Sequence, residues 1–247
     1  GFTASVLAMA AALALILAAV ALFMPSGLPR GRKGTKFTEV FSKDRNVNGL
    51  SAARVFLFGA RDVWFVVGIP IYFYGVLSDG TEAGNRAAFF QIGTFMALWI
   101  IGYGAVQAWA PRLLKAQRKT VAEVVRLAVT WAGLLTLIPF ALALAASIAG
   151  APAPWLTATL VAGLLVFGAV FAINSSVHSY LILAFTEAKR VTMDVGFYYM
   201  SNAAGRLTGT LLSGLSYQWG GLPLCLATAG LMAGASFLAI RRLDRAA

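Results

Sequence analysis

The run SAARVFLFGARDVWFVVGIPIYFY (residues 51–74) is apolar enough to cross a bilayer as a helix, yet it carries Arg54, Arg61 and Asp62. If this helix enters lipid near Leu50, Arg61 lies about 17 Å deep at ~1.5 Å per residue, close to the middle of a ~30 Å hydrocarbon core. An arginine at that depth costs at least ~2.5–3.5 kcal/mol to insert. Ionisable groups inside membrane spans usually line a pathway, so we favour that interpretation for Arg61 over an ion pair that only fixes helix packing.

Two further charges accompany Arg61. Arg54 precedes it by two helical turns and points to nearly the same side, so we expect Arg54 either to bind a ligand with Arg61 or to extend to the cytoplasmic surface. Adjacent side chains point about 100° apart on a helix, so we do not expect Arg61 and Asp62 to pair with each other. For Asp62 we favour compensation of an arginine, with proton coupling as the alternative.

The composition identifies an integral membrane protein. Of the 247 residues, 60% are hydrophobic and 12% are charged, which is about half the charged fraction of a typical soluble domain. The net charge of +11 would suggest nucleic acid as a partner of a soluble chain, but 16 of the 20 Lys and Arg residues lie in or beside four of the segments that separate or follow the apolar runs. This placement is the positive-inside bias of membrane proteins and leaves no basic face for nucleic acid.

The sequence lacks the residue patterns of catalysis and of metal binding. Its single cysteine, Cys225, excludes a disulfide within the chain, and its single histidine, His178, belongs to no metal-ligand spacing. No nucleophile–base pair and no phosphate-cradling loop can be recognised. We therefore expect no metal, no cofactor and no enzymatic activity.

Apolar runs of sufficient length predict seven transmembrane helices and hence an all-α membrane protein. The runs cover residues 2–24, 51–74, 87–110, 127–149, 155–186 and 195–219, and a last run that follows Gly220 and Gly221 and ends at Ile240. Basic residues fill the segments after the first, third, fifth and seventh runs, whereas the other segments hold one arginine between them. We therefore predict that the chain starts outside the cell and that its C-terminus is cytoplasmic.

Polar side chains on the later runs lie at the predicted depth of Arg61. Counted from the cytoplasmic ends of their runs, Arg206 comes to about 17 Å and Asn174 to about 18 Å. Asn202 lies one turn before Arg206, and His178 one turn after Asn174, on the same helix faces. We predict that these residues form a midplane binding site with Arg61; hydrogen bonding between helices is the alternative. Planar guanidinium groups suit carboxylate and phosphate oxygens, so the predicted ligand is a small organic anion.

Three segments resemble parts of known transporters. They are SAARVFLFGARDVWFVVGIPIY (51–72), IGYGAVQAWAPRL (101–113) and SNAAGRLTGTLLSGLSYQWGGL (201–222). The chain resembles the C-terminal half of a major facilitator superfamily transporter preceded by its sixth helix, and within that superfamily the organoarsenical efflux subgroup called ArsJ. The resemblance implies three parts: the last helix of the N-terminal half (1–24), a cytoplasmic central loop (25–49) and a C-terminal domain of six helices (50–247).

The resemblance also implies a function. Superfamily transporters work by alternating access between two six-helix halves, which makes the upstream N-terminal half a partner and the lipid bilayer of the cell (inner) membrane the location. The subgroup exports 1-arseno-3-phosphoglycerate, which a glyceraldehyde-3-phosphate dehydrogenase makes from arsenate, and so contributes to arsenate resistance. The alternatives are an exporter of another anion or of a drug, and a seven-helix receptor or sensor.

Overall fold

The computed structural model describes residues 2–23 and 41–243, and every regular element among them is helical. The chain divides into two units, Gly1–Phe37 and Thr38–Ala247. The first unit contains α1 (Phe2–Phe23), a helix of 22 residues with no charged side chain. Most of the predicted central loop lies outside the described residues.

The second unit opens with α2 (Arg45–Val63). Oδ1 of Asp44 accepts hydrogen bonds from the backbone N–H groups of Asn46 (2.7 Å) and Val47 (3.0 Å). These bonds satisfy two of the amide groups that have no partner at the start of a helix, which is why the helix begins here. The helix therefore starts five residues before the predicted domain boundary at residue 50.

The helix that begins as α2 contains one wide π turn, Trp64–Gly68, and continues as α3 (Ile69–Leu77). Pro70 is the second residue after this turn. Proline lacks an N–H group, and its ring clashes with the carbonyl group four residues earlier, so regular α-helical bonding is interrupted there. We attribute the wide turn to this interruption, since π turns and prolines are recognised causes of irregularity in long helices.

Three further helices form the middle of the unit: α4 (Glu82–Leu114), α5 (Val121–Ala149) and α6 (Pro154–Phe185). A buried hydrogen bond joins two of them, because Nε1 of Trp99 on α4 donates to the carbonyl oxygen of Leu164 on α6 (2.8 Å). The ring of Trp99 also lies 5.3 Å from that of Trp64, centroid to centroid. The core of the unit is thus built around aromatic side chains from three helices.

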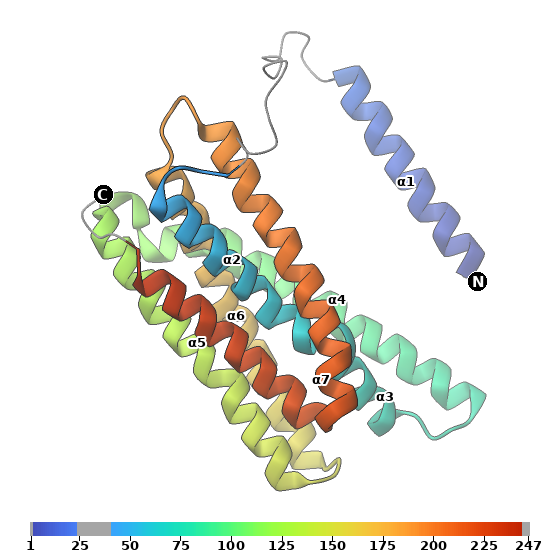
Figure 1. Ribbon diagram of the computed structural model, residues 1–247. Coiled ribbons are helices and arrows are strands. Elements are labelled where there is room, and N and C mark those ends of the chain that lie inside the picture. The colour runs from blue at the N-terminus through green and yellow to red at the C-terminus, as the bar shows by residue number, and fades with distance from the viewer. Residues whose placement is uncertain (1, 24–40, 244–247) are drawn as a thin grey trace. The chain divides into compact units, whose positions relative to one another are not determined.

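The last element, α7 (Val191–Arg241), is 51 residues long, but its backbone leaves helical dihedral angles at Gly220 (φ −150°, ψ 22°) and Gly221 (φ 60°, ψ −155°). Residues with a side chain rarely adopt the positive φ of Gly221. In Figure 1 the orange part of α7 before these glycines and the red part after them run in opposite directions. We call residues 191–219 the first arm of α7 and residues 222–241 the second arm.

Contacts with α2 and its π turn show the direction of the first arm. Gly205 packs against the backbone of Val55, and further along both helices the backbone N–H of Val67 donates to Oγ of Ser213 (3.2 Å). The residue numbers rise together, so the first arm runs parallel to α2. The contact at Gly205 is close because glycine has no Cβ, which allows two helix backbones to approach each other.

The second arm runs the other way. Sγ of Cys225 donates to the carbonyl oxygen of Val63 (3.0 Å), and Oγ of Ser236 donates to that of Ala53 (2.9 Å). Because the numbers on α7 rise while those on α2 fall, the second arm is antiparallel to α2. The chain therefore reverses at Gly220 and Gly221, where the sequence predicted the boundary between two runs.

Six helices of the described residues are long and apolar enough to cross a membrane, one fewer than predicted. The difference lies in α7, because the runs predicted as the sixth and seventh spans form the two arms of this single element. The prediction of an all-helical chain with several helices able to cross a membrane is confirmed for the described residues. The count of seven crossings remains a prediction.

Candidate functional site

Asp62 lies between two arginines. Its Oδ1 is 2.6 Å from Nε of Arg61, and its Oδ2 is 3.3 Å from Nε of Arg206. The prediction that Arg61 and Asp62 do not pair is wrong, because the long arginine side chain folds back far enough to overcome the angle between adjacent positions. The preferred role of Asp62, compensation of an arginine, agrees with this geometry. We call Arg61, Asp62 and Arg206 the charge triad.

Glycines bring the members of the triad together across the contact between α2 and the first arm of α7. A Cβ added at Gly209 would lie 2.6 Å from the carbonyl oxygen of Gly59 and 3.1 Å from Cβ of Asp62. Any larger residue at position 209 would therefore push the first arm away from α2. Arg206 lies almost one turn before Gly209, so this close contact sets its distance from Asp62.

The three members of the triad differ in exposure. The exposed fraction of the side chain is 4% for Asp62, 13% for Arg61 and 62% for Arg206. Both arginines use Nε to contact Asp62, and within the described residues their terminal nitrogens donate no hydrogen bond. With two cations and one anion, the triad has a net charge of +1. Arg206 therefore presents free N–H donors on an exposed face of the first arm of α7.

Arg54 belongs to a second, separate cluster. Only 3% of the residue is exposed, so of the two alternatives for Arg54, extension to the cytoplasmic surface does not hold. Its Nη1 donates to the carbonyl oxygen of Ser175 (3.3 Å) and to the Oγ of the same residue (3.1 Å). Its Cζ lies 4.2 Å from the centroid of the Phe58 ring and 4.7 Å from that of the Tyr198 ring. Hydrogen bonds and aromatic faces thus stabilise this buried cation, and no carboxylate among the described residues pairs with it.

Phe58 connects the two clusters. Cζ of Arg61 lies 5.0 Å from the centroid of the Phe58 ring, which also contacts Arg54. Arg54 and Arg61 therefore lie on the same side of α2, as their seven-residue spacing predicts. Sequence reasoning missed Phe58, although an aromatic residue four positions after an arginine lies within reach on a helix.

The remaining candidates do not reach the charge triad through any hydrogen bond or ion pair among the described residues. Asn174 and His178 are fully buried on α6, and Nδ2 of Asn174 donates to the carbonyl oxygen of Val170 (3.3 Å). Oδ1 of Asn174, both ring nitrogens of His178 and Oδ1 of Asn202 have no hydrogen-bond partner within the described residues. The predicted single site is thus divided into the triad, the Arg54 cluster and three polar side chains that no hydrogen bond among the described residues joins to either.

The described residues contain no group of three or more His, Cys, Asp or Glu side chains that could hold a metal ion. Comparison with protein-family models, with curated proteins and with solved structures found no match to this chain. The chemistry of the site therefore follows from its own residues. They offer guanidinium N–H donors and a net positive charge, and they lie in helices apolar enough to cross a membrane.

Proposed function

We propose that the chain is part of a membrane transporter that exports a small organic anion by alternating access. The observation that carries this proposal is the exposed guanidinium group of Arg206, whose Nε contacts the buried carboxylate of Asp62. A guanidinium group in a helix that faces only lipid costs several kcal/mol, so we infer that this face lines an aqueous passage. Its free N–H donors suit carboxylate or phosphate oxygens of a solute that enters the passage.

The three arginines have different roles in this proposal. Arg206 binds the anion directly, because it combines charge with exposure. Arg61 is less exposed and adds positive charge beside it, while Asp62 holds both groups at their Nε atoms. Arg54 is sequestered from solvent and influences the site through Phe58, which lies against both Arg54 and Arg61.

The proposed substrate is the organoarsenical 1-arseno-3-phosphoglycerate, and its supply links the transporter to a glyceraldehyde-3-phosphate dehydrogenase. The support is the resemblance of residues 51–72 and 201–222 to the ArsJ subgroup, together with the anionic oxygens of this molecule. In this proposal the two arms of α7 make separate crossings, α1 supplies the seventh, and an N-terminal half completes the passage in the inner membrane. An exporter of a different phosphorylated or carboxylated anion would use the same guanidinium chemistry.

The test is arsenate resistance in cells that express the complete transporter together with the dehydrogenase. Arg206→Ala and Arg61→Ala should lower the tolerated arsenate concentration, and cell-associated arsenic should rise. Arg112→Ala is the matched control, because Arg112 is an exposed arginine near the end of α4 and forms no ion pair among the described residues. Unchanged resistance in both triad variants, at equal membrane abundance, would remove the proposed role of the triad.

A further inference from the structure

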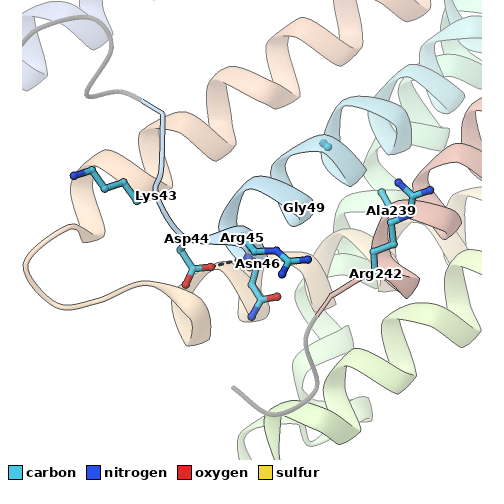
Figure 2. A pocket seen from close by; sticks show the side chains of 8 residues that line it. Lys43, Asp44, Arg45, Asn46, Gly49, Ala239 and Arg242 are labelled. Atoms are coloured by element: carbon cyan, nitrogen blue, oxygen red, sulfur yellow. Dashed lines mark hydrogen bonds between the residues drawn. The ribbon is translucent and has the colours of Figure 1, made fainter.

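A second cationic site lies at the end of the second unit where α2 begins and the second arm of α7 ends. It is a cavity of about 610 Å³ lined by Lys43, Asp44, Arg45, Asn46, Gly49, Ala52, Ala239 and Arg242. Figure 2 shows Arg45 at the start of α2 and Arg242 at the end of α7, with Lys43 at the outer edge of the group. None of the residues that line the cavity belongs to the charge triad, and the cavity has no part in the proposed transport.

The residues that line this cavity carry more positive than negative charge. Lys43, Arg45 and Arg242 are exposed, and none of them forms an ion pair among the described residues. The only acid in the lining, Asp44, directs Oδ1 to the backbone N–H groups that start α2. Three cations against one anion leave a net charge of +2, so the cavity favours a ligand with negative charge. Two guanidinium groups at one cavity are well suited to the oxygens of a phosphate.

The rest of the lining shows which kind of phosphate fits. Arg45, Gly49 and Ala52 follow each other at spacings of four and three, which places them along one face of α2. Ala239, in the last turn of α7, and Arg242, which directly follows α7, form a similar pair three residues apart. Both faces carry charge at the end of the helix and only small, uncharged side chains further in. A free phosphate has no apolar group to place against the uncharged part. A phospholipid, in contrast, can place its phosphate at the arginines and an acyl chain over the small residues.

The position along the helices agrees with a lipid. Arg45 is the first residue of a helix long and apolar enough to cross a membrane, and Arg242 directly follows the last residue of another. Cationic side chains at such ends lie at the level of lipid headgroups. Basic pockets between transmembrane helices at this level are typical binding sites for anionic headgroups. We therefore propose that this cavity binds the phosphate of an anionic phospholipid.

The experiment measures lipid binding to the full chain in detergent micelles, by native mass spectrometry and by the rise in unfolding temperature. Phosphatidylglycerol should bind roughly tenfold or more tightly than phosphatidylcholine with the same acyl chains. Inorganic phosphate and glycerol 3-phosphate, at the same concentration, should neither raise the unfolding temperature nor displace the lipid. Equal binding of both lipids, or displacement by either soluble phosphate, would overturn the proposal.

Matched variants assign the effect to this cavity. Arg45→Gln with Arg242→Gln should lower the affinity for phosphatidylglycerol about tenfold or more. Arg112→Gln with Arg118→Gln removes the same charge from exposed positions elsewhere and should leave the affinity unchanged. Ala52→Leu keeps every charge but fills the uncharged part, and it should weaken phosphatidylglycerol binding severalfold. An equal loss of affinity in the control pair would show general electrostatic attraction and contradict a specific site. Unchanged binding of phosphatidylglycerol by the Arg45 and Arg242 double variant would also contradict a site in this cavity.

Discussion

Nε of Arg206 lies 3.3 Å from Oδ2 of Asp62, which joins the first arm of α7 to α2 by a charge pair between two apolar helices. On the other side of the same carboxylate, Arg61 is 2.6 Å away. One carboxylate therefore pairs with two guanidinium groups, whose residues are 145 positions apart in the chain (206 − 61). This arrangement makes Asp62 the residue on which the geometry of the proposed site depends.

Asp62→Asn should destabilise the protein more than Arg206→Gln. Removing the shared carboxylate leaves Arg61 nearly buried without a counter-charge, at an expected cost of about 2–4 kcal/mol. Arg206→Gln should cost less than about 1 kcal/mol, because this arginine is largely exposed. Unfolding temperatures of the purified variants give the order. A loss from Arg206→Gln as large as that from Asp62→Asn would contradict the asymmetric burial of the triad.

Gly205 and Gly214 provide a matched pair of substitutions on the first arm. A Cβ at Gly205 would collide with the backbone of Val55, whereas a Cβ at Gly214 would meet nothing within 4 Å. Gly205→Ala should therefore cost about 1–3 kcal/mol as the helices move apart. Gly214→Ala should be neutral or stabilising by up to about 1 kcal/mol, since alanine favours helix. Similar unfolding temperatures for the two variants would show that α2 and α7 do not touch at Gly205.

Arg54→Met separates stability from function. Methionine has nearly the length of arginine without its charge, and burial of a charge that no carboxylate pairs is costly. We therefore expect an unfolding temperature at or above that of the wild type. If Arg54 also tunes the electrostatics of the passage, the same variant should lower arsenate resistance. A strongly destabilised Arg54→Met protein would show that the bonds to Ser175 outweigh the cost of burying the charge.

The loop between α3 and α4 should show a pH dependence of its own. Thr81 donates hydrogen bonds to Oδ1 of Asp79 from its Oγ1 (2.7 Å) and from its backbone N–H (2.9 Å), and these bonds lower the pKa of Asp79. A lowered pKa means that the contribution to stability is present above the ordinary pKa of an aspartate and is lost as pH falls through the lowered value. The difference in unfolding temperature between wild type and Asp79→Asn should therefore be largest near neutral pH. It should vanish in strong acid, and a difference that persists there would have another cause.

The sequence alone was sufficient for the helical class and for the position of the reversal in α7. Long uncharged runs predict helices, because a backbone inside lipid must satisfy its own hydrogen bonds. Gly220 and Gly221 predict a break, because they interrupt an apolar pattern with residues that favour turns. Likewise, the seven-residue spacing of Arg54 and Arg61 predicts one shared face of α2 by helix geometry alone.

Only the tertiary structure decided how the charges are distributed. Residue spacing describes directions on one helix, whereas the partner of a charge depends on which other helix approaches and how closely. Gly205 and Gly209 allow the first arm of α7 to reach α2, which gives Arg206 its contact with Asp62. Burial of Arg54 likewise results from the packing of α2 against α6 and α7, which surrounds its guanidinium group with Ser175, Phe58 and Tyr198. Long side chains can adopt several directions from the same backbone, and contacts between helices select one of them.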